Sequence, residues 1–212
     1  TEEYQRMFDQ MTESVLKDKT LKENFKNIKK IYFSRRKFGK AAATEFGEEY
    51  IEQCFNQNGY ESLGPETLTL REQIYVWNHA EAIACMNGTI PLNVVFCKNE
   101  ELKLTILNKM SIYHKNPYIY LYMRNIQAEF IDIYKEPLKG YPKSLGEGPY
   151  LIKEGKEFFD YCQREKFEIP YTGMKLKFYD LKQEIRYYLC VIGIRNKIRR
   201  VGLYIKRKML RR

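Results

Sequence analysis

Apolar β-forming runs alternate with helical stretches between residues 30 and 134, and this alternation limits the fold more than any other feature. Short runs rich in Ile, Tyr, Phe and Leu predict strands at 30–34, 60–63, 81–86, 102–107 and 128–134. Between them we expect helices at 46–58, 70–79, 90–96 and 116–124. Helical crossovers join parallel strands. The sequence therefore predicts an α/β fold with a Rossmann-like parallel sheet.

Capping residues mark the starts of two of these helices. Thr69 is a suitable N-cap for helix 70–79, and Glu72 at the third helical position would complete a capping box. Asn116 and Pro117 suit the N-cap and first position of helix 116–124. Outside this region we expect helices at 2–28, 150–166 and 174–210, and a surface loop at 136–149. This divides the chain into an N-terminal helix (1–29), a Rossmann-like domain (30–149) and a C-terminal helical extension (150–212).

The formal net charge of +10 is concentrated at the C-terminus. Residues 195–212 contain nine Lys or Arg and no acidic residue, which leaves +1 for residues 1–194. A nucleic-acid binder would carry its charge over the folded face, so we expect no nucleic-acid partner; a basic-tailed nucleic-acid-binding α/β protein is the weaker alternative.

Several other classes of protein are disfavoured. The longest apolar stretch, at about 187–194, is shorter than the ~20 residues of a membrane span. Acidic residues near the start do not fit a signal peptide, and the five scattered cysteines contain no Cys-x-x-Cys pair. The cysteine pattern fits a reducing cytosol. The two histidines are too few and too far apart to suggest a metal centre, and we expect no cofactor.

Two predicted strand ends carry residues suited to phosphate binding. Ser34-Arg35-Arg36-Lys37 follows the first strand, and Asn87-Gly88-Thr89 follows the third strand and opens a helix. Parallel sheets bind ligands at the carboxyl ends of their strands, and helix N-termini and arginine forks hold phosphate. Each segment alone is also explained by a solvated loop or an ordinary Asn-Gly turn. Their placement together favours a diphosphate site.

The order of short motifs over residues 30–110 resembles glycosyltransferase family 61, a family of inverting sugar-nucleotide transferases that includes capsule-polysaccharide enzymes. The matching segments are Ile31-Tyr-Phe-Ser-Arg35, Gly47-Glu48-Glu49, Gly59-Tyr60, Pro65-Glu66, Glu72-Gln73, Ala80-Glu81-Ala82-Ile83 and 87–96. The stretch 131–149 is similar to a capsule-locus branch of the family. The family has His and Ala where this chain has Asn87 and Thr89. Asparagine does not titrate near neutral pH, which puts any proton transfer at that position in doubt.

The resemblance implies a nucleotide-sugar donor, in particular a UDP-sugar, and transfer without a metal, in keeping with the lack of an Asp-x-Asp motif. It assigns the donor diphosphate to Arg35, Lys40, Asn87, Gly88, Thr89 and Asn93. The base or ribose would contact Asn108 and Lys109. The catalytic candidates are His114, Glu48 and Glu72. His114 can also be read as an exposed loop histidine, and Asn93 as a residue that holds the turn. The two glutamates can be read as ribose ligands, as structural partners of Arg35 or as helix-capping carboxylates.

The family's members are two-domain GT-B enzymes that bind the donor mainly in the C-terminal half, and this chain resembles only that half. The acceptor half would then come from a partner chain, a homo-oligomer or a longer form of this chain. The alternative function is a non-catalytic nucleotide-sugar-binding or interaction subunit of a two-part glycosyltransferase. The acceptor implied by the resemblance is a lipid-linked sugar or a growing capsular polysaccharide.

The C-terminal tail has the pattern of an amphipathic helix. Ile194, Ile198, Val201, Ile205 and Met209 recur at spacings of 4, 3, 4 and 4, and basic residues fill much of the remaining surface. We expect residues 194–212 to contact an anionic membrane at the inner face of the cell membrane. Docking of this helix on its own domain or on a partner protein is the alternative.

Overall fold

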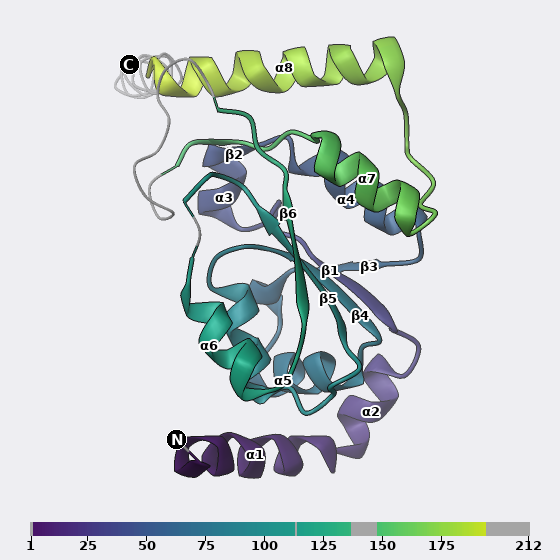
Figure 1. The fold of residues 1–212 in the computed structure, drawn as a ribbon, viewed down its shortest axis with the longest axis vertical. Helices are drawn as coiled ribbons and strands as arrows, with labels where there is room; N and C mark the ends of the chain where they lie inside the picture. Colours follow the sequence, from purple (N-terminus) through teal and green to yellow (C-terminus); the bar gives the residue numbers. More distant parts are fainter. Residues whose placement is uncertain (1, 113, 137–147, 194–212) are drawn as a thin grey trace, which may run out of the picture.

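The computed structural model describes residues 2–112, 114–136 and 148–193. A parallel five-stranded sheet lies at its centre, with strand order β3-β1-β4-β5-β6 (Figure 1). The strands are β1 (Lys30–Phe33), β3 (Glu61–Leu63), β4 (Ala82–Met86), β5 (Lys103–Asn108) and β6 (Ala128–Asp132). Every strand predicted from the sequence is therefore present, and the α/β fold with a Rossmann-like sheet is confirmed.

The strand order changes direction between β1 and β4. From β1 the chain first adds β3 on one side and then adds β4, β5 and β6 on the other side. In this register Phe33 lies beside Leu63 of β3 and Cys85 of β4, so the three strands end close together. A change of direction in a parallel sheet opens a crevice at the carboxyl ends of the strands, where such folds bind ligands.

Helices cover both faces of the sheet because alternate strand residues point to opposite sides. On one face Phe33 stacks on Trp77 with ring centres 5.9 Å apart, and on the other Tyr32 stacks on Phe55 at 5.2 Å. The first face is covered by α5 (Leu70–His79), the 3-10 helix η2 (Ile90–Phe96) and α6 (Asn116–Met123). The second is covered by α4 (Glu48–Gln57) and α7 (Lys156–Arg164). The core is thus divided into two layers.

The N-terminal region forms two helices where the sequence predicted one, over 2–28. α1 (Glu2–Leu16) and α2 (Lys19–Phe25) are separated at Asp18. The Asp18 carboxylate accepts hydrogen bonds from the backbone N–H groups of Thr20 and Leu21, at 2.9 and 3.3 Å, and so caps a new helix. The capping preference of aspartate therefore outweighs the helical pattern around it.

A small second sheet was not predicted. α3 (Gly39–Thr44) leads into β2 (Glu45–Phe46), which pairs in parallel with β7 (Tyr150–Leu151). The predicted helix 46–58 therefore begins only at Glu48, after Gly47, whose φ is +108°. The predicted helix 150–166 was wrong at its start, because Tyr150 and Leu151 are buried strand residues and α7 begins at Lys156.

Three smaller features also differ from the prediction. Segment 90–96 is a 3-10 helix rather than an α-helix, and another 3-10 turn, η1 (Pro65–Thr67), follows β3. Lys115 occupies the N-cap position of α6, and Asn116 is already helical. The capping box of Thr69 and Glu72 on α5 is confirmed.

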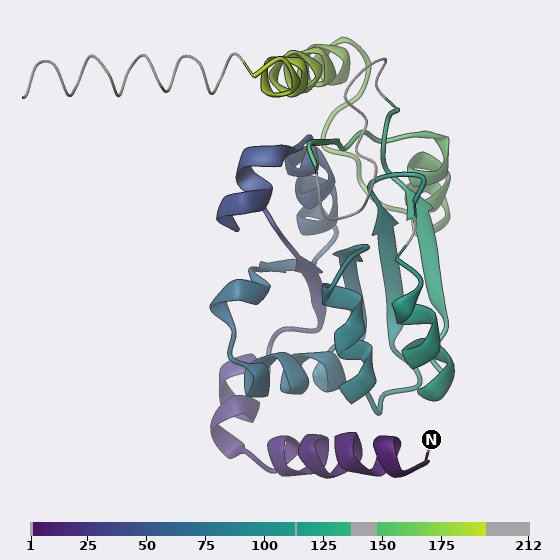
Figure 2. The same cartoon turned by 90° about the vertical axis from the view of Figure 1, so that its left-hand side faces the viewer.

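The last described helix, α8 (Gly173–Val191), lies at the end of the molecule opposite α1 (Figures 1 and 2). The predicted amphipathic tail at 194–212 and most of the predicted loop at 136–149 lie outside the described residues. Across the residues that are described, no helix combines the length and the apolar character that a membrane crossing requires.

Candidate functional site

A cavity of about 820 Å³ opens at the carboxyl ends of β1 and β4, where the strand order changes direction. Its size lies within the range of small-molecule sites, roughly 300–1,000 Å³. It is lined by Arg35, Phe38, Lys40, Thr44, Glu45, Pro65, Glu66, Gln73, Gly88, Thr89, Ile90, Asn93, Lys109, His114, Gly148 and Tyr150. Seven of the site candidates predicted from the sequence line this cavity: Arg35, Lys40, Gly88, Thr89, Asn93, Lys109 and His114.

One wall of the cavity combines two cations with a carboxylate that the sequence analysis missed. Glu45 accepts a hydrogen bond from Lys109 Nζ at 2.7 Å and another from Arg35 Nε at 3.2 Å. Arg35 Nη2 also lies 3.2 Å from Glu45 Oε1. The Lys109 and Glu45 side chains are only 5% and 3% exposed. These three groups together carry one net positive charge at the cavity wall.

Lys109 is held on a second side by an aromatic ring. Its ammonium lies 4.2 Å from the centre of the Tyr150 ring, a cation–π distance. Burial lowers the pKa of Lys109, and the Glu45 carboxylate opposes that shift. Tyr150 reaches this position because β7 pairs with β2, which places it directly beside Glu45. The small second sheet thus builds the cationic wall.

Gly88, which follows β4, also lines the cavity. A Cβ atom at this position would meet no atom within 4 Å, so local packing does not require glycine here. The missing side chain keeps the backbone after β4 open to the cavity. Because η2 is a short 3-10 helix, its dipole favours an anion less than that of the expected α-helix.

Asn93 and Gln73 brace the loops around the cavity. Asn93 Nδ2 donates to Gln73 Oε1 at 2.7 Å, and Gln73 Nε2 donates to the carbonyl oxygens of Pro65 and Leu68 at 3.0 and 3.2 Å. Asn93 therefore holds η2 against the segment after β3, as one reading of the sequence expected. Gln73 was quoted within a motif but was not chosen as a site residue.

Asn87 and Asn108 lie outside the cavity lining and join three strand ends. Asn87 Nδ2 donates to Asn108 Oδ1 at 2.8 Å, and Asn108 Nδ2 donates to Asp132 Oδ1 at 2.8 Å. This buried chain connects the carboxyl ends of β4, β5 and β6. Asn87 Oδ1 is buried and has no hydrogen-bond partner within the described part of the chain.

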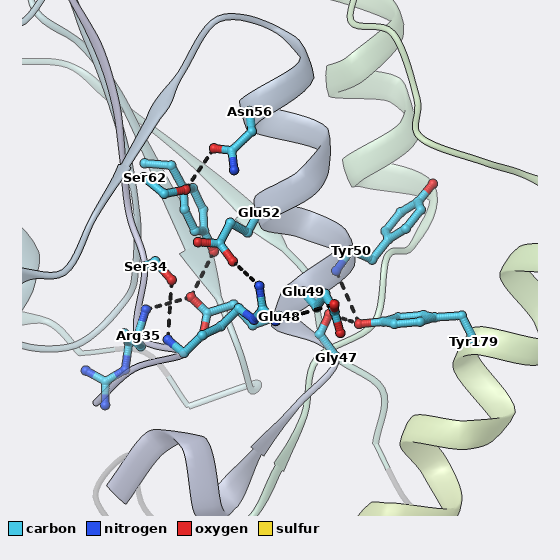
Figure 3. A network of polar contacts seen from close by, with 12 residues as sticks. Ser34, Arg35, Gly47, Glu48, Glu49, Tyr50, Glu52, Asn56, Ser62 and Tyr179 are labelled. Carbon is cyan, nitrogen blue, oxygen red and sulfur yellow. Dashed lines mark hydrogen bonds and ion pairs between the residues drawn. The ribbon is translucent and has the colours of Figure 1, made fainter. Parts of the chain in front are cut away.

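Glu48 supports the loop after β1 from behind the cavity. It is buried at the start of α4 and accepts hydrogen bonds from the Arg35 backbone N–H at 2.8 Å and the Tyr32 hydroxyl at 3.2 Å (Figure 3). Burial raises the pKa of Glu48 to about 7, against the opposing effect of the Arg35 N–H. Nearby Glu52 pairs with Arg36 at 2.6 Å. Glu48 is therefore placed to fix the backbone of Arg35.

Glu72 and His114, the other catalytic candidates, have different surroundings. Glu72 Oε2 accepts from the Thr69 backbone N–H at 2.7 Å within the capping box, and Glu72 does not line the cavity. His114, on the loop between β5 and α6, lines the cavity. Its Nδ1 is buried and has no hydrogen-bond partner in residues 2–112, 114–136 and 148–193. The same residues contain no group of three or more His, Cys, Asp or Glu side chains arranged as metal ligands.

Comparison with known proteins assigns the chain to a family. The family model for Glycosyltransferase 61 matches residues 2–107, half of the chain. The match includes β1, β4 and both loops that carry Arg35 and Gly88 to the cavity. A search of curated proteins finds no match. The chain belongs to glycosyltransferase family 61.

Proposed function

We propose that this chain binds the nucleotide-sugar donor of an inverting glycosyltransferase that extends a capsular or other cell-surface polysaccharide. Family membership supports a transferase. The observation that carries the finer assignment is the cavity where the strand order changes direction, between β1 and β4. Arg35, Lys40 and Lys109 line it. These cations would bind the donor diphosphate, and a UDP-sugar is the donor class that the resemblance implies.

The charges at the cavity suit the leaving group of glycosyl transfer. When the acceptor oxygen attacks the anomeric carbon, the glycosidic C–O bond breaks and negative charge builds up on the departing diphosphate. Arg35 can offer parallel N–H donors to phosphate oxygens, and Lys109 adds a buried point charge. Cations held in place before the reaction stabilise such charge without rearranging. Gly88 and Thr89 would let the diphosphate approach the backbone after β4.

His114 is the proposed base. Inverting transfer needs a group that removes the proton from the acceptor hydroxyl as that oxygen attacks, and histidine commonly serves this role near neutral pH. Its place in the cavity wall supports the assignment. Glu48 acts in this proposal by positioning Arg35, and Glu72 has a capping role.

The remaining partners follow from the family resemblance. The acceptor would be a lipid-linked or polysaccharide chain, and the acceptor half would come from a partner chain, a further copy or additional sequence. Residues 194–212 would bring the enzyme to the anionic inner face of the cell membrane.

Calorimetric titration with UDP, a UDP-sugar panel and ADP tests the donor site. We expect Arg35→Ala to weaken UDP binding about 10- to 100-fold, because a charge-assisted contact is lost. Gly88→Ala should weaken it too while leaving the melting temperature unchanged, since a Cβ atom at this position meets no atom within 4 Å. Arg71→Ala is the matched control: this arginine is exposed, pairs with Asp18 and lies outside the cavity. Equal UDP affinity in Arg35→Ala and the wild type would refute the assignment.

A further inference from the structure

A row of large apolar side chains runs along the outer face of α8. Its members are 41–68% exposed and recur at spacings of 4, 3, 4, 4 and 3: Met174, Phe178, Leu181, Ile185, Leu189 and, at the C-cap, Ile192. These spacings put them on one side of the helix. The opposite side is buried through Leu176, Gln183 and Tyr187. At 1.5 Å per residue the row is roughly 27 Å long.

The acidic residues of α8 are turned toward the body of the protein. Lys153 Nζ lies 2.9 Å from Asp180 and 3.5 Å from Glu184, and Lys135 Nζ lies 2.6 Å from Glu184. These pairs fix the orientation of the helix. They also withdraw both carboxylates of α8 from its outer face.

The charges that remain beside the row are positive. Lys175, Lys177 and Lys182 are all exposed. At about 100° per residue, Lys177 falls on one side of the row and Lys175 and Lys182 fall on the other. An apolar strip with lysines along both borders is the pattern of a helix lying in a membrane interface, where lysine stems cover apolar surface and their ammonium groups reach anionic headgroups.

The position of α8 allows such contact. In both views the helix lies across one end of the molecule, with the sheet and its other helices all on its inner side (Figures 1 and 2). A flat surface could therefore reach the length of the row. A second copy of the chain fits less well, because pairing two such faces would bring lysine borders together.

We propose that the outer face of α8 binds an anionic lipid surface. The inference rests on described residues and does not depend on residues 194–212 or on donor binding. Both lysine borders and the apolar row take part, so binding requires apolar contact as well as opposite charge.

Co-sedimentation of the full chain with vesicles tests the proposal. The vesicles contain phosphatidylcholine alone or phosphatidylcholine with phosphatidylglycerol. The variant Phe178→Ser/Leu181→Ser/Ile185→Ser should lower partitioning into the phosphatidylglycerol vesicles at least about tenfold, because three apolar side chains that would be buried in the lipid are lost. The matched control is Tyr4→Ser/Met7→Ser/Met11→Ser, which replaces exposed apolar residues of α1 at the other end. The control should bind as the wild type does.

Two further measurements distinguish insertion of the α8 face from attraction by charge alone and from self-association. Lys177→Gln/Lys182→Gln should reduce the preference for phosphatidylglycerol. A tryptophan introduced by Phe178→Trp should be quenched by brominated lipid, whereas one introduced by Met7→Trp should not. Unchanged melting temperatures and UDP affinities would show that the variants are folded and the donor site is intact. If the α8 triple variant co-sedimented with vesicles as much as the wild type does, the proposal would be overturned. Self-association through α8 without vesicle binding would also overturn it.

Discussion

Glu45 and Glu48 lie on either side of Gly47, yet their carboxylates have contrasting surroundings. Glu45 faces the cavity wall and is paired with two cations, Arg35 and Lys109. Glu48 is buried behind the cavity and receives hydrogen bonds from a neutral N–H and a phenol. Both act on Arg35: Glu45 holds its guanidinium and Glu48 holds its backbone. Glu45 therefore balances charge in the cavity, whereas Glu48 supports the loop after β1.

Gly47→Ala should lower the free energy of unfolding more than the other substitutions, because it disturbs the surroundings of both Glu45 and Glu48. The φ of Gly47 is +108°, and a Cβ there would lie 1.9 Å from the carbonyl oxygen of Ile152. Strain in the left-handed region and displacement of the backbone should together lower the free energy of unfolding by about 4 kcal/mol. Urea unfolding followed by circular dichroism measures this change.

Gly59→Ala is the matched control for that substitution. Gly59 also has a positive φ, +81°, but a Cβ there would meet nothing within 4 Å. It should therefore lose only about 1 kcal/mol, from strain alone. Equal losses in the two variants would show that the contact of Gly47 with the segment before α7 does not matter.

Glu48→Gln should change how stability depends on pH. Burial raises the pKa of Glu48 from 4.5 to about 7, so the folded state holds this proton more tightly than the unfolded state. Stability from this group is complete below pH 4.5 and is lost as pH rises through 7, by about 3 kcal/mol. Glutamine can still accept the bonds from Arg35 and Tyr32 and should remove this loss. Unfolding free energies measured from pH 4.5 to 8 compare the two proteins.

Glu154 affects the same experiment, since burial raises its pKa to about 7 as well. Glu154 contributes the same pH dependence of the unfolding free energy to both proteins. The difference between wild type and Glu48→Gln therefore isolates the contribution of Glu48. Glu49→Gln is the control, because Glu49 is a partly exposed neighbour paired with Arg36, and it should retain the pH dependence of the wild type. Parallel pH curves for wild type and Glu48→Gln would contradict the assignment.

The main sheet was predictable because its signals are local. Each strand is a short apolar run, and the Thr69–Glu72 capping box spans only four residues. The β2–β7 pair was not predictable, because each strand has only two residues and the partners lie far apart in the chain. The same limit hid Glu45: its role depends on Lys109, which is 64 positions away. Arg35 and Gly88 were found because they directly follow strands.

Glu45→Ala should lower the free energy of unfolding less than Gly47→Ala does, but it gives the most direct evidence on the cavity. Without this carboxylate, buried Lys109 and partly exposed Arg35 face each other unpaired. We expect a loss of about 2 kcal/mol in the free energy of unfolding, which is below the roughly 3–5 kcal/mol of a fully buried pair because Arg35 is partly exposed. Thermal denaturation with and without UDP measures both the loss and its recovery.

An anion that binds between these cations should replace the missing charge. UDP should therefore raise the melting temperature of Glu45→Ala more than that of the wild type, since its diphosphate relieves a repulsion that the wild type lacks. Glu66→Ala is the control, because Glu66 also lines the cavity but has no ion pair in the part of the chain that the structure describes. Equal shifts in wild type and Glu45→Ala would mean that the diphosphate binds away from Arg35 and Lys109. A larger shift confined to Glu45→Ala would place it at the wall that β2 and β7 build.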